Sequence, residues 1–278
     1  MNADLHCHST LSDGWLSPAE VVRRAHAHGV ALLALTDHDE LGGVAEAAAQ
    51  AAALSMDFVT GVEISVSWRD ETIHIVGLGL DPANPALLAG LAQVRSGRQA
   101  RAEAMAAALE RAGMHDVLAG ARRQARNPEM IGRAHFARHL VASGLMPDVH
   151  TVFNHYLVRG KPGFIDHQWA ALADAVTWIN NAGGIAVVAH PARYRRLSTA
   201  ALERLFDEFI EAGGAGVEVV AGAQTPDEML RFATLARRRG LLASRASDFH
   251  GPEESLVDIG RCPPLPPDLV PVWSRLGF

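Results

Sequence analysis

The chain has 278 residues, 49% hydrophobic and 20% charged, so it can bury a sizeable core as one barrel or as two modest domains. No apolar run approaches the length needed to cross a bilayer, and no basic-then-apolar leader follows Met1; we therefore expect a cytoplasmic protein without a membrane partner. Two cysteines are too few for a disulfide framework. The net charge of −6 argues against a general nucleic-acid binder.

Short apolar segments alternate with helical patterns along most of the chain. Strand-like segments rich in β-branched residues cover 3–8, 31–36, 58–64, 73–78, 185–189, 216–220 and 241–243. Helical patterns cover 170–182, 199–212 and 226–239. This alternation predicts a parallel sheet with right-handed crossovers, and the continuous apolar strands predict that both faces are covered. We therefore expect an α/β fold in which about seven strands form a closed or nearly closed barrel.

The first crossover helix is well defined by its ends. Ser17 and Glu20 have the spacing of a capping box, and Pro18 stands at the first helical position. Gly29 stands where this helix should stop. The segment 261–271 is rich in proline and is expected to be an extended tail.

The stretch 90–165 interrupts the alternation. It has no convincing strand but contains helical patterns at 91–112 and 131–142. We interpret the chain as a single domain, 1–278, with a helical insertion at 90–165 between the strands of His74 and His190. The insertion holds eleven basic and five acidic side chains, whereas the rest of the chain is acidic. This excess is equally consistent with a solvated helical surface and with an anion-binding role.

The first expected strand carries a pair of potential metal ligands. His6 and His8 are two residues apart, so their side chains leave the same face of a strand while Cys7 points to the other. Asp13 follows in a short polar turn with Gly14, close enough to bring a carboxylate back over the strand end. Alone, such a pair is more often incidental than a metal site.

Similar residues occur at or near the ends of other expected strands, in Thr36-Asp37-His38-Asp39, at Glu63 and His74, in His190-Pro191 and in Asp248-Phe249-His250. In a barrel the carboxyl ends of the strands meet at one mouth. We therefore expect six histidines and three carboxylates to share one pocket. Asp37 and Asp39 are more simply interpreted as solvated surface carboxylates than as supports for the ligands.

These motifs, from His6 to His250, resemble those of the PHP (polymerase and histidinol phosphatase) family. The resemblance implies a distorted (β/α)7 TIM-like barrel that hydrolyses phosphoesters with two or three divalent ions, most often manganese, with zinc and iron as alternatives. It implies three ligand sets, in which Glu63 bridges two ions: His6, His8, Glu63 and Asp248; Glu63, His74 and His190; Asp13, His38 and His250. Asp13 departs from the pattern, since relatives can carry histidine there.

The predicted nucleophile is metal-bound hydroxide, because metal ions lower the pKa of bound water and clamp the attacking and leaving oxygens. No protein nucleophile is predicted, since the sequence contains neither a nucleophile elbow nor a phosphate-binding P-loop.

The insertion supplies the candidates for substrate binding. Basic and aromatic residues that could grip a second phosphate and a base are Arg98, Arg101, Arg133, His135, Lys161, Phe164 and His167. For each basic residue taken singly, solvation at the surface is the simpler interpretation. As a group they favour a second anionic pocket.

The insertion, with its Gly-Arg-x-His and Gly-Lys-Pro segments, resembles the PHP branch of nucleoside 3′,5′-bisphosphate phosphatases and 5′→3′ RNA exonucleases. The predicted function is release of the 3′-phosphate to give a nucleoside 5′-monophosphate, without an obligate protein partner. Exonuclease action on short RNA oligonucleotides and histidinol phosphate phosphatase activity are alternatives within the family. A non-catalytic metal domain and carbon–nitrogen bond hydrolysis are alternatives outside these activities. The acidic flanks argue against a long nucleic-acid track.

Overall fold

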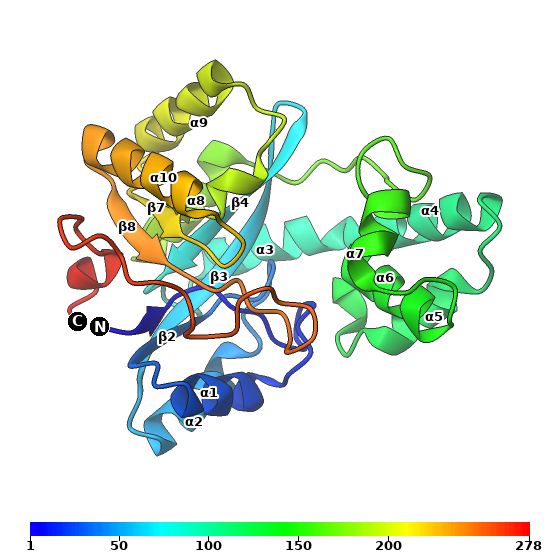
Figure 1. Cartoon of the computed structure of the whole chain (residues 1–278), viewed down its shortest axis with the longest axis horizontal. Helices are drawn as coiled ribbons and strands as arrows, with labels where there is room; N and C mark the ends of the chain where they lie inside the picture. The colour runs from blue at the N-terminus through cyan, green and yellow to red at the C-terminus, as the bar shows by residue number, and fades with distance from the viewer.

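A curved sheet forms the frame of the protein in the computed structural model, which describes residues 1–278. The strand path is β1 (Ala3–Asp4), β2 (Leu32–Leu35), β3 (Asp57–Trp68), β4 (Glu71–Leu78), β6 (Ile185–Val188), β7 (Gly216–Val220) and β8 (Leu242–Arg245), with β5 (Ala170–Ala171) beside β3. The backbone N–H of Leu5 donates to the carbonyl of Arg245 at 3.1 Å, which links the two ends of the path. The prediction of a nearly closed, seven-stranded α/β barrel is confirmed (Figure 1).

One strand runs against the others, contrary to the expectation of a wholly parallel sheet. β4 pairs antiparallel with both β3 and β6, whereas the other neighbouring pairs are parallel. Only Arg69 and Asp70 separate β3 from β4, so the connection is a hairpin without room for a crossover helix. His74 therefore reaches the mouth from the first half of its strand, and not from a carboxyl end.

Helices cover the outside of the sheet. The predicted helices appear within two residues of their expected ends as α8 (Leu172–Asn181), α9 (Thr199–Glu211) and α10 (Pro226–Arg239), and a further helix, α2, spans Val44–Ala53. The first helix, α1 (Pro18–Ala27), has the expected capping box, and Gly29 follows it with a φ of +72° that suits glycine. No helix is both long and apolar enough to cross a membrane.

The expected helix 91–112 is divided at Gly97 into α3 (Pro85–Ser96) and α4 (Arg98–Arg111). α3 contributes Leu87 and Leu91 to the main core of the barrel, so it packs with the sheet. Gly97 has no side chain, and a Cβ there would collide with the ring of His167.

The remaining helices of the insertion have a hydrophobic cluster of their own. We call residues 98–157, which include α4, α5 (Val117–Gln124), α6 (Arg133–Ala142) and α7 (Val149–Val152), the cap. Leu109, Phe136 and Leu140 are fully buried in its cluster. The cap stands beside the barrel in Figure 1.

Candidate metal centre

The nine predicted donors gather at one mouth of the barrel. His6 and His8 point to the same side, as the spacing predicts, and both are fully buried. The thiol of Cys7 points away from them and donates to the carbonyl of Ala34 at 3.2 Å. This alternation places two imidazoles at the centre from one short segment.

A first group of donors surrounds Glu63 Oε2. His6 Nε2 lies 3.2 Å from this oxygen and 3.1 Å from His8 Nε2. Asp248 Oδ1 lies 3.1 Å from His8 Nε2 and 3.4 Å from His6 Nε2. Donors that are each about 2.1 Å from one ion are roughly 3 to 3.5 Å apart, so these four have the separations of a single coordination sphere.

The second oxygen of Glu63 faces a different group. Oε1 lies 2.8 Å from His74 Nδ1 and 2.9 Å from His190 Nε2, and the two nitrogens are 3.3 Å apart. Glu63 is itself fully buried. Its carboxylate thus has one oxygen in each of two adjacent donor groups, which is the geometry of a bridging ligand.

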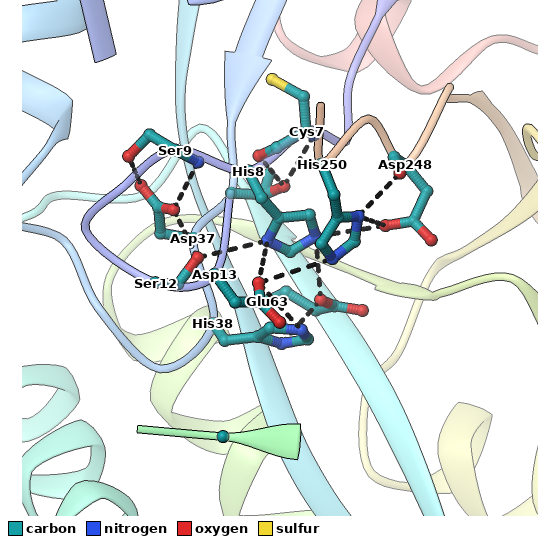
Figure 2. Close-up of polar contacts among 12 residues, drawn as sticks. Cys7, His8, Ser9, Ser12, Asp13, Asp37, His38, Glu63, Asp248 and His250 are labelled. Atoms are coloured by element: carbon teal, nitrogen blue, oxygen red, sulfur yellow. Dashed lines mark hydrogen bonds and ion pairs between the residues drawn. The ribbon is translucent and has the colours of Figure 1, made fainter. Parts of the chain in front are cut away.

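A third group is wider. Asp13 Oδ1 lies 3.4 Å from His250 Nε2 and 3.9 Å from His38 Nε2 (Figure 2). His8 Nδ1 is also 3.9 Å from this oxygen, so His8 stands between the first and third groups. A cation here would draw these donors closer together.

Several buried donor atoms lack hydrogen bonds, and this tests whether the site fits metal ions. Glu63 Oε2, Asp13 Oδ1 and His38 Nδ1 have no hydrogen-bond partner. His38 Nδ1 nevertheless lies 2.8 Å from Glu63 Oε2, so the two atoms are close without hydrogen-bond geometry. Buried polar atoms are rarely left without a partner. Converging lone pairs of this kind fit divalent cations, and the mixed imidazole and carboxylate set accepts several first-row metals.

The electrostatics of the site divide the histidines. Burial would lower the pKa of His6 and His38, but Glu63 raises both, that of His38 to about 9, so a metal ion would displace a proton from each. Burial and the neighbouring His250 and His38 lower the pKa of His8 to about 3. Burial also lowers the pKa of His74 to about 4, against the attraction of Glu63. Burial would raise the pKa of the Glu63 carboxyl, but the imidazoles of His38 and His74 hold it well below its usual value. His8 and His74 are therefore neutral and Glu63 is ionised near pH 7, as metal ligation requires.

Asp37 supports the loop that carries Asp13. Its carboxylate accepts hydrogen bonds from the Ser9 backbone N–H at 2.7 Å, the Ser9 hydroxyl at 2.6 Å and the Ser12 hydroxyl at 2.5 Å (Figure 2). The interpretation of Asp37 as a solvated surface carboxylate is wrong, because the residue is buried. These hydroxyl and amide groups donate the hydrogen bonds that water would otherwise give to the carboxylate.

Asp39 is also buried, so the same interpretation is wrong for it. It accepts hydrogen bonds from the backbone N–H and hydroxyl of Ser65, at 2.7 and 2.9 Å, and forms an ion pair with Arg98. Asp39, His190 and Asp248 all have positive φ, of 49°, 25° and 54°. Such strained backbone gathers at functional sites, where the surrounding structure holds it.

Three residues of the site were missed from the sequence. Glu218 contacts His6 and His190 from β7, Arg193 pairs with Asp248, and the hydroxyl of Tyr194 accepts from the His74 backbone N–H at 2.9 Å. One signal was present for Glu218, which is the single charged residue in an otherwise apolar strand.

A cavity of about 660 Å³, which we call the basic cavity, opens beside the donors. It is lined by Asp13, His38 and His74 of the centre and by seven arginines. Five of the residues predicted to bind substrate line it: Arg98, Arg101, Arg133, Phe164 and His167.

Arg101 and Arg133 differ from the other arginines of the basic cavity because neither forms an ion pair with a carboxylate. Burial and the nearby charges of Arg133 and Arg98 lower the pKa of Arg101 to about 9. The guanidinium of Arg98 is held by Asp39, whereas no carboxylate lies within ion-pair distance of Arg101 or Arg133. Their repulsion would be relieved by a bound anion.

Two of the predicted substrate-binding residues lie elsewhere. His135 is buried, and its Nδ1 accepts a hydrogen bond from the Gly132 backbone N–H at 3.1 Å, so it caps its own helix. Lys161 is exposed and lines neither this cavity nor its neighbour.

A profile of the PHP domain family matches residues 4–219. The chain belongs to the PHP domain family. A relative, the 3′,5′-nucleoside bisphosphate phosphatase of Chromobacterium violaceum, is 55% identical over 275 residues, or 99% of this chain and 96% of that protein. The 5′-3′ exoribonuclease Rnm of Escherichia coli is 41% identical over 273 residues, or 98% of this chain and 92% of that protein.

A solved structure has the same fold. The structure of an amidohydrolase from Chromobacterium violaceum, with bound sulfate and no metal, matches with a TM-score of 0.97 at 55% identity. The match covers 100% of this chain and 96% of the other. The resemblance inferred from the motifs is thus confirmed at the level of family and fold.

Proposed function

We propose that this PHP protein hydrolyses the 3′-phosphate of a nucleoside 3′,5′-bisphosphate and leaves the nucleoside 5′-monophosphate. The observation that carries the proposal is the pair of unpaired guanidinium groups, Arg101 and Arg133, in the same cavity as His38 and His74. A substrate with two phosphates can place one at the metal donors and the other at these arginines, since both sites attract a dianion. A substrate with one phosphate would leave the second site without a partner.

The nine donors would hold two or three divalent ions, for which manganese is the first candidate and zinc and iron are alternatives. When bound, such ions activate water and offset the negative charge of a phosphoryl group. Glu63 would contribute one carboxylate oxygen to each of two neighbouring ions. Arg193, which lines the cavity beside Asp248, would contact the phosphoryl group from the protein side.

The aromatic residues of the basic cavity suit a nucleoside. Phe164 and His167 line the same cavity as the unpaired arginines. The ring of His167 meets Trp169 edge to face at 4.3 Å, which fixes its orientation. Such rings provide faces on which a base can stack. The activity of the Chromobacterium violaceum relative supports this substrate class for the present chain.

A second candidate function is 5′→3′ exonuclease action on short RNA, as in the Escherichia coli relative. It is favoured by a second cavity of about 1150 Å³, which borders Asp13, Asp248 and His250 of the same centre. Here a 5′-terminal nucleotide would occupy the basic cavity, and the rest of the strand would leave through the second cavity.

Phosphate release distinguishes these activities. Substrates would be 3′,5′-adenosine bisphosphate (pAp), 5′-AMP, histidinol phosphate and a short 5′-phosphorylated RNA, each with manganese and with a chelator. We expect the highest kcat/KM for pAp, and loss of activity with the chelator. A higher kcat/KM for the RNA would favour the exonuclease, and preference for histidinol phosphate would overturn the role given to Arg101 and Arg133.

A further inference from the structure

Arg138, a buried residue of the cap helix α6, joins two loops that carry donors of the third group. Its Nη2 donates to the backbone carbonyl of Asp13 at 2.5 Å. Its Nε and Nη2 also donate to the two carboxylate oxygens of Glu254, at 2.8 and 2.7 Å, in the turn that follows His250. Buried charges are stable in proteins only when they are paired, so Arg138 holds these two loops together.

Trp15 reinforces the junction of the two loops. Its backbone N–H donates to the carbonyl of His250 at 2.7 Å, and its ring centroid lies 4.8 Å from the guanidinium carbon of Arg138. A Cβ at Gly251 would collide with this ring. Trp15 therefore packs against both the arginine and the loop of His250, which restricts the movement of either.

The cap also holds the loop of the remaining donor of the third group, His38. The next residue, Asp39, forms its ion pair with Arg98 at the start of α4. A further contact comes from Asn127, whose Nδ2 donates to the carbonyl of Leu11 at 3.1 Å, in the loop between β1 and α1. Cap side chains thus reach all three loops that supply the third group.

The donors of the first and second groups are oriented from the barrel instead. Glu218 of β7 contacts the ring of His6 and the backbone of His190. Tyr194, from the segment after β6, accepts a hydrogen bond from the backbone N–H of His74. The support of the third group therefore differs in origin from the support of the other two.

We propose that Arg138 is a positioning residue for the metal ion of the third group, which we call the third ion. By tying the cap to the loops of Asp13 and His250, it sets the separation of these donors. Asp13 Oδ1 lies 3.4 Å from His250 Nε2 and 3.9 Å from His38 Nε2, so a small shift of either loop would remove a ligand from the third ion. Affinity for the third ion then depends on the cap, whereas affinity for the first two ions does not.

The positive charge of Arg138 does not oppose a cation at the third group, because Glu254 pairs with it through two hydrogen bonds. A planar guanidinium can bind a carboxylate with two nitrogens and still donate to a further acceptor. A lysine has a single ammonium group on a flexible stem and lacks this fork. Lysine at this position would therefore retain the charge but weaken the link between the loops.

The inference rests on the proposed function, which assigns divalent ions to the three donor groups. Its test counts ions and does not use turnover, so the two can fail separately. A protein that binds three ions and releases no phosphate from pAp would contradict the proposed function alone.

The test measures manganese binding to the chelator-treated protein by calorimetric titration, and counts the ions retained after gel filtration by mass spectrometry. We expect three ions per unmodified chain and two per chain of Arg138→Met, with affinity for the third ion about 10- to 100-fold weaker. The first two affinities should be unchanged. Arg123→Met, at an exposed arginine on α5, is the matched control and should retain three ions.

Glu218→Gln should show the reverse pattern, with weaker binding of the first two ions, because Glu218 orients residues of the first and second groups. Its matched control is Glu211→Gln, at an exposed residue on α9, which should bind all three ions as the unmodified protein does. Circular dichroism checks the fold of each variant.

Unchanged affinity for the third ion in Arg138→Met would overturn the proposal, as would only two ions in the unmodified protein. Loss of all ions from a folded Arg138→Met variant would also overturn it, because Arg138 would then support the whole centre. If Arg138→Met does not fold, Arg138→Lys decides the question. Its affinity for the third ion should fall by about threefold to tenfold, and an unchanged affinity would overturn the proposal.

Discussion

The carboxylate of Glu218 lies 2.7 Å from Nδ1 of His6, and its other oxygen accepts a hydrogen bond from the backbone N–H of His190 at 2.6 Å. One buried side chain therefore orients residues of two donor groups. Because His6 Nδ1 donates to Glu218, its Nε2 is left with a lone pair toward the centre.

Glu218→Gln should weaken metal binding by about 10- to 100-fold, since outer carboxylates hold ligand histidines in position. Competition with a fluorescent chelator measures the affinity, and circular dichroism checks the fold. Glu211→Gln is the matched control. Metal affinity equal to that of the unmodified protein would show that Glu218 has only a packing role.

Metal ions should stabilise the folded protein, because they would pair buried carboxylates such as Glu63 and Asp248 that now face only imidazoles and Arg193. At a free concentration 100 times the Kd, one ion adds about 2.7 kcal/mol to the free energy of unfolding. Denaturant unfolding of the chelator-treated protein, with and without manganese or zinc, measures this gain. Identical midpoints under all conditions would contradict the metal centre.

Arg133→Ala should raise KM for pAp by about 10- to 100-fold, because a charged hydrogen bond to phosphate contributes roughly 1.5 to 3 kcal/mol. The effect on kcat should be smaller, since Arg133 would hold the phosphate that does not react. Arg123→Ala is the control, because Arg123 is exposed on the cap and forms no ion pair. A fall in kcat without a change in KM would place Arg133 at the reacting phosphate.

His135 should make the stability of the cap depend on pH. Burial lowers the pKa of His135 from 6.5 to about 4, so the unfolded chain binds a proton more readily than the folded one. The folded state is therefore favoured above pH 6.5 and loses stability as the pH falls toward 4, by about 2 to 3 kcal/mol near pH 4.5.

His135→Gln removes this titration and keeps an acceptor for the Gly132 N–H. The free energy of unfolding of the variant should fall less between pH 7 and about 4.5 than that of the unmodified protein, as measured by urea titration with the metal content held equal. Parallel pH profiles for the two proteins would contradict the assignment.

The nine donors could be located from the sequence because strand ends converge and because each donor type recurred at such an end. His74 lies at the mouth of the barrel, as expected. The expected reason was a position near the carboxyl end of its strand, but the strand is antiparallel and His74 stands in its first half. The hairpin at Arg69 and Asp70 carries no glycine or proline, so its turn was not visible.

The supporting carboxylates could not be predicted, because sequence spacing does not tell which acidic side chains are buried. Asp37 and Asp39 lie in a polar segment that resembles a solvated loop, yet their partners come from Ser9, Ser65 and Arg98. Glu218 depends on a contact with a residue 212 positions away. Such contacts are set by the tertiary fold.

The separate core of the cap has an evolutionary consequence. All nine donors lie outside residues 98–157, whereas Arg101, Arg133 and Asp148 lie within them. Mutation or recombination confined to this one stretch can therefore change the cap side of both cavities while every donor is inherited unchanged. New substrate preferences could arise in this lineage by grafting a different cap onto an intact hydrolytic barrel.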